Sequence, residues 1–206
     1  MDLNIKDAAL QKSCPVTPVA RFTPFQPLAE PGERILIAAN GTFVEIKRAW
    51  GSFIRKVGDM VVTVPFGQMQ ESTTLHSPKL PMALLDRFVE MAKCEPNVEI
   101  GASIVWDEAT EEFSLLRSAS IEAGPGHLVY QLPPLGPQQH IVIDCHSHAR
   151  YKAYFSATDD KDDAHAVRFS FVVGNCDRVD HTTKMRLCVK GLFEFVDMNQ
   201  PTRNQQ

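Results

Sequence analysis

The sequence lacks the cysteine pattern of a chain held together by disulfides. Its five cysteines are an odd number, lie far apart and form no Cys-x-x-Cys pair. Neither a disulfide framework nor a structural zinc ribbon is therefore indicated, and we expect reduced thiols. With 206 residues the chain is long enough to form an apolar core without cross-links, as one main domain with an appendage.

Long apolar runs and concentrations of positive charge are also missing. No segment approaches the roughly 18 apolar residues of a membrane-spanning helix, and residues 1–18 lack the basic and apolar regions of a signal peptide. The formal charge is -4, and Lys and Arg are scattered singly. We therefore expect a cytoplasmic protein that binds neither membranes nor nucleic acids directly.

The first part of the sequence, residues 1–76, is predicted to be a small β-rich region. The segment RILIAANGTFVEIKRA contains two strand-like runs around Asn40-Gly41, a pair typical of a hairpin with a type I′ turn because both residues tolerate positive φ. The segment DMVVTVPFG is predicted to form a further strand. Whether this region docks a substrate or covers an apolar face of the following domain is open.

Residues 77–196 are predicted to form an α/β domain, and residues 197–206 a flexible tail. The segment SPKLPMALLDRFVEMAKCEP has apolar residues at helical spacing and ends at Pro96. VEIGASIVWD and EEFSLLRSASI are predicted strands, followed by a long loop in EAGPGHLVYQLPPLGPQQ. HIVIDCHSHA is the next strand, SATDDKDDAHAVRF a helix, and SFVVGNC and MRLCVKGLFEFV are closing strands.

Two histidines and one aspartate in this domain have the spacing of a metal site. His146 and His148 project from the same side of a strand, about 7 Å apart along it. Asp159 follows in the first turn of the next predicted helix. Two imidazoles and one carboxylate suit Zn²⁺, and three protein ligands leave the fourth tetrahedral position for water.

Each part of this pattern also has a structural explanation. His146 and His148 could be a pair of partly exposed strand residues. Ser156 and Asp159 have the spacing of a helix capping box, and the acidic residues from 159 to 163 are favoured near a helix N-terminus in any case. Asp144 could orient an imidazole or simply end a strand in solvent.

The full string His-Ser-His, seven residues, Ser, two residues, Asp resembles the signature of the JAMM metalloproteases, whose domain is also called MPN, Mov34 or JAB. The resemblance spans about residues 80 to 195 and implies an α/β fold with a mixed, curved sheet flanked by helices. The family also has an upstream glutamate, and Glu99 stands at that place, whereas Glu95 is less well placed. One departure is Ala149, where the family usually has proline.

The resemblance also implies an activity. In such a site zinc would activate water, Glu99 would act as general base and Ser156 would donate to the oxyanion. Segments such as AANGTFVEIKRAW and VVGNCD further resemble the protein A family of the bacterial PRTRC cassette, which also encodes ThiF-related and ubiquitin-like proteins. This implies a metallopeptidase with a ubiquitin-like or sulfur-carrier-like substrate and a ThiF-like activating enzyme as partner. The alternatives are a zinc amidohydrolase acting on a small adduct and a non-catalytic MPN-type scaffold.

Overall fold

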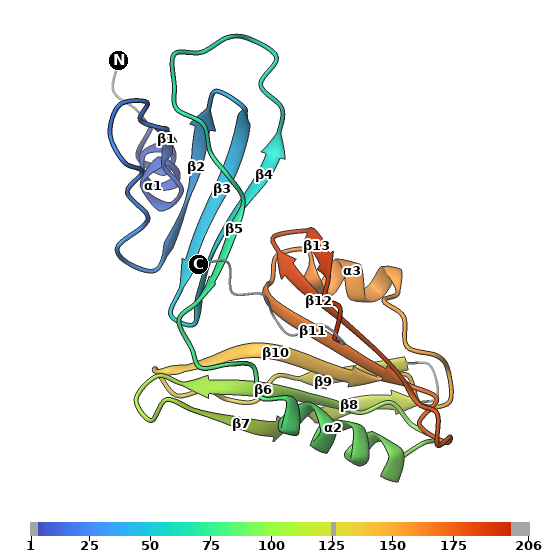
Figure 1. Ribbon diagram of the computed structural model, residues 1–206. Helices are drawn as coiled ribbons and strands as arrows, with labels where there is room; N and C mark the ends of the chain where they lie inside the picture. The colour runs from blue at the N-terminus through green and yellow to red at the C-terminus, as the bar shows by residue number, and fades with distance from the viewer. Residues whose placement is uncertain (1–3, 125–126, 199–206) are drawn as a thin grey trace. The chain divides into compact units, whose positions relative to one another are not determined.

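The computed structural model of the protein describes residues 4–124 and 127–198 (Figure 1). The chain divides into two compact units, Met1–Lys79 and Leu80–Gln206. Among the described residues, no helix combines the length and apolar character needed to cross a membrane. All five cysteines are free, and three of them, Cys145, Cys176 and Cys188, are buried.

The first unit is built on a five-stranded sheet with the order β1-β2-β3-β4-β5. Its strands are β1 (Val16–Pro18), β2 (Gly32–Ala38), β3 (Gly41–Arg48), β4 (Gly51–Gly58) and β5 (Ser72–Leu75). β1 pairs in parallel with β2, and the other neighbours are antiparallel. A core of Val19, Leu36, Ala38, Phe43, Ile54 and Met69 packs within the unit. The prediction of a β-rich N-terminal region is confirmed, although helix α1 (Ile5–Ser13), which buries no side chain, was not predicted.

Two details of this unit differ from the sequence prediction. The hairpin forms, but Ala38 pairs with Gly41, so the turn residues are Ala39 and Asn40 and only Gly41 has positive φ. The predicted strand DMVVTVPFG is wrong, because residues 59–67 connect β4 to β5 without forming a strand. Val61 in this segment is 95% exposed. The Gly67 amide donates one backbone hydrogen bond to the Val19 carbonyl, and the Gly67 carbonyl accepts one from the Ala39 amide.

The second unit contains a six-stranded sheet with the order β13-β12-β11-β10-β6-β7. Its strands are β6 (Gly101–Asp107), β7 (Glu112–Arg117), β10 (Gln139–Ser147), β11 (Val167–Gly174), β12 (Thr182–Val189) and β13 (Leu192–Phe195). β10 pairs in parallel with β11 and antiparallel with β6. The helices are α2 (Met82–Cys94) and α3 (Ala157–Asp163). This mixed sheet flanked by helices confirms the predicted α/β class.

The two helices pack on opposite faces of the sheet. Phe88 of α2 makes an edge contact with Phe171 of β11, at 6.3 Å between ring centroids. Asp163 of α3 instead accepts a hydrogen bond from Ser170, the preceding residue of the same strand. Because successive side chains of a strand point to opposite faces, α2 covers an apolar face and α3 a polar one. His146 and Asp144 pair with Val172 and Ser170, and so lie on the α3 face.

Two predicted segments of the second unit are corrected by the structure. The long loop before β10 contains a hairpin of β8 (Ala119–Gly124) and β9 (His127–Gln131), and the strand predicted before it is divided between β7 and β8. The helix predicted over residues 156–169 ends at Asp163, because residues from Val167 onward pair with β10 and β12. Strand pairing therefore overrides local helix propensity here.

Candidate metal centre

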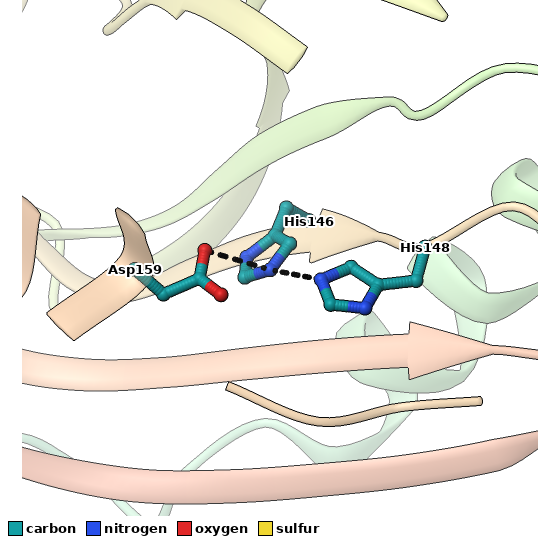
Figure 2. A group of neighbouring side chains, drawn as sticks. All are labelled: His146, His148 and Asp159. Carbon is teal, nitrogen blue, oxygen red and sulfur yellow. Dashed lines mark hydrogen bonds and ion pairs between the residues drawn. The ribbon is translucent and has the colours of Figure 1, made fainter. Parts of the chain in front are cut away.

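The three predicted metal ligands lie together where β10 ends (Figure 2). The Nε2 atoms of His146 and His148 are 3.1 Å apart, and His146 Nε2 is 3.3 Å from Asp159 Oδ1. Ligand atoms from the three residues all lie within 4.8 Å of one another. His146 is in β10, His148 directly follows the end of that strand, and Asp159 is in the first turn of α3, the next element of the chain.

The separations between these atoms fit a tetrahedral zinc ion. Bonds of about 2.0–2.2 Å to nitrogen and oxygen place neighbouring ligand atoms of a tetrahedron roughly 3.3–3.6 Å apart. The observed 3.1 Å and 3.3 Å are close to these values. Two neutral rings that turned their Nε2 lone pairs toward each other at this short distance would repel. A cation bound between the two Nε2 atoms would remove this repulsion. The residues therefore fit zinc, with a fourth position left for water or substrate.

Burial keeps both imidazoles in the neutral form that binds metals. Desolvation lowers the pKa of His146 well below its usual value, and this outweighs the raising effect of the Asp159 carboxylate. Desolvation likewise lowers the pKa of His148, against the opposing effects of Asp159 and a hydrogen bond with the Lys152 backbone. At pH 7 neither ring has to lose a proton before it coordinates a cation.

Ser156 and Asp159 form a capping box at the start of α3. The Asp159 amide donates to Ser156 Oγ at 3.2 Å, and the Ser156 amide donates to Asp159 Oδ2 at 2.5 Å. Asp159 therefore uses one carboxylate oxygen for the cap and turns the other, Oδ1, toward His146. Because the Ser156 hydroxyl acts as an acceptor in the cap, its own O–H stays available as a donor. Capping and a role in the site are thus compatible.

Glu99 lies beside the candidate ligands, whereas Glu95 is engaged elsewhere. Glu99 is 8% exposed and lines a pocket of about 230 Å³ together with His146, His148 and Asp159. The Glu95 carboxylate pairs with Arg117 at 2.6 and 2.8 Å, and the hydrogen bond from Arg117 lowers its pKa. Of these two glutamates, Glu99 is therefore the one that lies in the pocket of the candidate ligands.

The backbone after His148 turns in a way that proline does not permit. Ala149 is fully buried and has φ 48°, whereas the proline ring fixes φ near −65°. Its carbonyl accepts a hydrogen bond from the Cys176 amide. The loop then passes so close to Gly174 that a Cβ there would lie 2.3 Å from Tyr151 O. Ala149 therefore has a backbone conformation beside the site that a proline at this position could not adopt.

Asp144 takes neither of the roles considered from the sequence. It is 4% exposed, and its Oδ2 accepts a hydrogen bond from the Tyr130 hydroxyl at 2.7 Å and lies 2.8 Å from Arg168 Nη2. Within the described part of the chain its Oδ1 has no hydrogen-bond partner, so it orients no imidazole. Burial raises the pKa of Asp144, against the lowering effects of Arg168 and Tyr130.

Sequence analysis missed the charged residues that surround this aspartate. Arg168 Nη2 bridges Asp144 and Asp163, at 2.8 and 3.2 Å, and Arg186 also pairs with Asp163. Burial raises the pKa of Asp163, but hydrogen bonds from Ser170 and Arg186 hold it below its usual value. These residues have no regular spacing, and only the register of β10, β11 and β12 brings them together.

Comparison with known protein families gives two matches. Residues 81–188 match the family described as prokaryotic homologs of the JAB domain, which covers just over half of the chain and includes the metal ligands, Glu99 and Ser156. Residues 4–76 match a domain of unknown function, DUF2016. A search of curated proteins found no match.

The capping box predicts a measurable contribution of Ser156 to stability. Ser156→Ala should lower the free energy of unfolding of the metal-free protein by about 1 kcal/mol, because the Asp159 amide loses its acceptor. Ser156→Asp should recover most of this loss, since aspartate is also a good N-cap. Urea denaturation of the three proteins measures both effects, and equal stability of Ser156→Ala and wild type would contradict the cap.

The left-handed backbone at Ala149 predicts that the family's usual proline is not tolerated here. Ala149→Pro should lower the free energy of unfolding by more than about 1 kcal/mol, because its φ is incompatible with the observed turn. Ala149→Gly is the matched control and should stay within about 1 kcal/mol of wild type, since relief of backbone strain offsets the lost methyl group. A proline variant as stable as wild type would show that the loop follows another path.

Proposed function

The chain belongs to the prokaryotic homologs of the JAB domain, and from this we propose that it is a zinc-dependent hydrolase acting on a peptide or isopeptide bond. The bond lies at the C-terminus of a ubiquitin-like or sulfur-carrier-like protein. The observation that carries the proposal is the placement of His146, His148 and Asp159 at ligand distances, with Glu99 in the same pocket.

The reaction assigns separate roles to the residues around the pocket. His146, His148 and Asp159 would hold the zinc ion, and when bound it would supply Lewis-acid activation of water and of the scissile carbonyl. Glu99 takes a proton from the attacking water and delivers it to the leaving amine, a role that suits a carboxylate in this position. The Ser156 hydroxyl donates to the carbonyl oxygen as negative charge develops there.

The proposed substrate is supported by the resemblance to the PRTRC cassette. That gene set combines a protein of this type with a small ubiquitin-like protein and a ThiF-related protein. A ThiF-like enzyme activates the C-terminus of its small protein partner, and a hydrolase that removes groups from this C-terminus would complement it. The ubiquitin-like protein is therefore the proposed substrate, and the ThiF-like enzyme the proposed functional partner.

The size of the pocket is also compatible with a second candidate function, the hydrolysis of a small amide adduct. Its volume of about 230 Å³ is below the roughly 300–1,000 Å³ of typical small-molecule sites. A pocket of this size suits a small amide adduct on a carrier protein as well as the few residues next to a scissile bond. Substrates with a peptide tag and with a small amide at the same C-terminus distinguish the two functions.

The ligand geometry predicts one zinc per chain. Elemental analysis of protein purified without chelator should give a ratio close to one, and His148→Ala should remove most of the metal because only two ligands remain. His181→Ala is the matched control, since this histidine is exposed and lies outside the pocket. Full zinc content in His148→Ala would contradict the assigned ligand set.

The position of Glu99 predicts a loss of hydrolysis without a loss of metal. The zinc-loaded protein should release a C-terminal tag from the ubiquitin-like protein, as followed by mass spectrometry. Glu99→Gln should slow this at least about a hundredfold, because an amide cannot accept the proton, while zinc content stays unchanged.

The matched control for this variant is Glu95→Gln, which should retain activity because Glu95 pairs with Arg117 at the surface. Activity that depends on Glu95 and not on Glu99 would reassign the base. Zinc binding without cleavage of any C-terminal adduct would favour the non-catalytic scaffold.

A further inference from the structure

Helix α3 is attached to the sheet through charge and not through an apolar face. Among its seven residues, Asp163 is the only buried one. A surface helix normally fixes its orientation by burying an apolar stripe, and α3 has none. Its orientation must therefore come from the polar contacts of its buried carboxylate and from the cap at its N-terminus.

The contacts of Asp163 reach two strands of the sheet. Its Oδ2 accepts from Ser170 Oγ at 2.7 Å and from Arg186 Nη2 at 2.9 Å, while its Oδ1 accepts from Arg168 Nη2 at 3.2 Å. Arg186 also donates through Nη1 to Asp160 Oδ1 at 2.5 Å. We call Asp163, Ser170, Arg168 and Arg186 the α3 anchor.

Arg186 is itself held in place by its surroundings, so it gives α3 a fixed point of attachment on the sheet. Its side chain is 2% exposed, and its guanidinium lies 4.0 Å from the ring centroids of both Phe155 and Phe193. Arg186 pairs with Ser170 across β12 and β11, so two of the residues that contact Asp163 stand side by side on the sheet. A planar guanidinium held between two rings can aim its donors in only a few directions.

The anchor lies one helical turn from the metal ligand. Residues four apart lie on the same side of a helix, so Asp163 and Asp159 face the sheet together. A rotation of α3 about its axis would move both carboxylates at once. Arg186 holds the helix at two positions, Asp163 and Asp160, and Asp160 is the residue next to the ligand Asp159. The anchor therefore limits the positions that the Asp159 carboxylate can take relative to His146.

We propose that Asp163 and Arg186 are positioning residues for the metal centre: they set the orientation of α3 on the sheet and thereby hold Asp159 at ligand distance from His146. This inference rests on the zinc site of the proposed function but not on its hydrolytic activity. It assigns a role in metal affinity to a buried charge pair outside the group of candidate ligands.

The test measures zinc affinity by competition with a chromogenic chelator, using the full chain. Asp163→Asn should raise the Kd for zinc by tenfold or more, the usual range for residues that orient metal ligands. Ser170→Ala removes one donor to Asp163 and should raise the Kd about threefold. It keeps the test decisive if Asp163→Asn does not fold.

A matched control separates positioning from general destabilisation. Phe88→Leu loosens the core on the opposite face of the same sheet, where Phe88 contacts Phe171. Urea denaturation of the metal-free variants measures the stability of each. Phe88→Leu should lose stability and keep its zinc Kd within twofold of wild type, whereas the anchor variants should lose affinity beyond what their stability predicts.

A double-mutant cycle tests whether the anchor acts through Asp159. In the Asp159→Ala background the ligand is already gone, so Asp163→Asn or Ser170→Ala should change the remaining zinc Kd by less than twofold. The same increase in Kd in both backgrounds, or a wild-type Kd in both anchor variants, would overturn the inference. If the wild-type protein binds no zinc, the proposed function fails and the inference fails with it. Normal zinc binding without cleavage would remove only the proposed activity.

Discussion

The parallel pairing of β10 with β11 is the constraint on which the rest of the site depends. Two consecutive parallel strands cannot be joined by a tight turn, so the chain after His148 has to cross one face of the sheet before β11 begins at Val167. That crossing segment contains Ser156 and Asp159. The histidines at the end of one strand and the carboxylate in the crossover are thus brought together by topology, before any metal is bound.

The division of the sheet into an apolar and a polar face explains how a short helix can serve this site. On one face α2 packs through aromatic and aliphatic side chains. On the other, Asp144, Ser170 and Arg186 pair across three adjacent strands and meet the buried end of α3. A buried charge is costly without a partner, and here Arg168 and Arg186 supply partners for the carboxylates of Asp144 and Asp163. Burial on this face also lowers the pKa values of His146 and His148, which keeps both imidazoles neutral.

The sequence is most informative where the residues of the candidate site lie close together along the chain. His146, His148, Ser156 and Asp159 lie within 14 consecutive residues, so the whole string could be compared with the signature of a known metalloprotease family. Arg168 and Arg186 come from separate strands, and their relation to Asp163 depends on a register that no periodicity reports.

The errors in secondary structure have similar causes. The strand at Val167 was assigned to a helix, because its pairing with distant residues is invisible in a local window. The hairpin of β8 and β9 was concealed by glycine and proline, and with it Tyr130 as a partner of Asp144. Residues 197 and 198 are described without regular structure, and the remainder of the predicted tail, residues 199–206, lies outside the described residues.

The donor set of the candidate centre has a consequence for redox chemistry. Its ligands are nitrogen and oxygen atoms only, although three cysteines are buried in the chain. Burial raises the pKa of Cys145, Cys176 and Cys188, to about 11 for Cys176 and about 12 for Cys188, so these thiols stay protonated and unreactive near neutral pH. Oxidants that strip zinc from thiolate sites by converting sulfur to disulfide or sulfenic acid have no ligand to attack here. A centre of this composition would not lose its coordinating atoms to the thiol oxidation that dismantles a cysteine-based one.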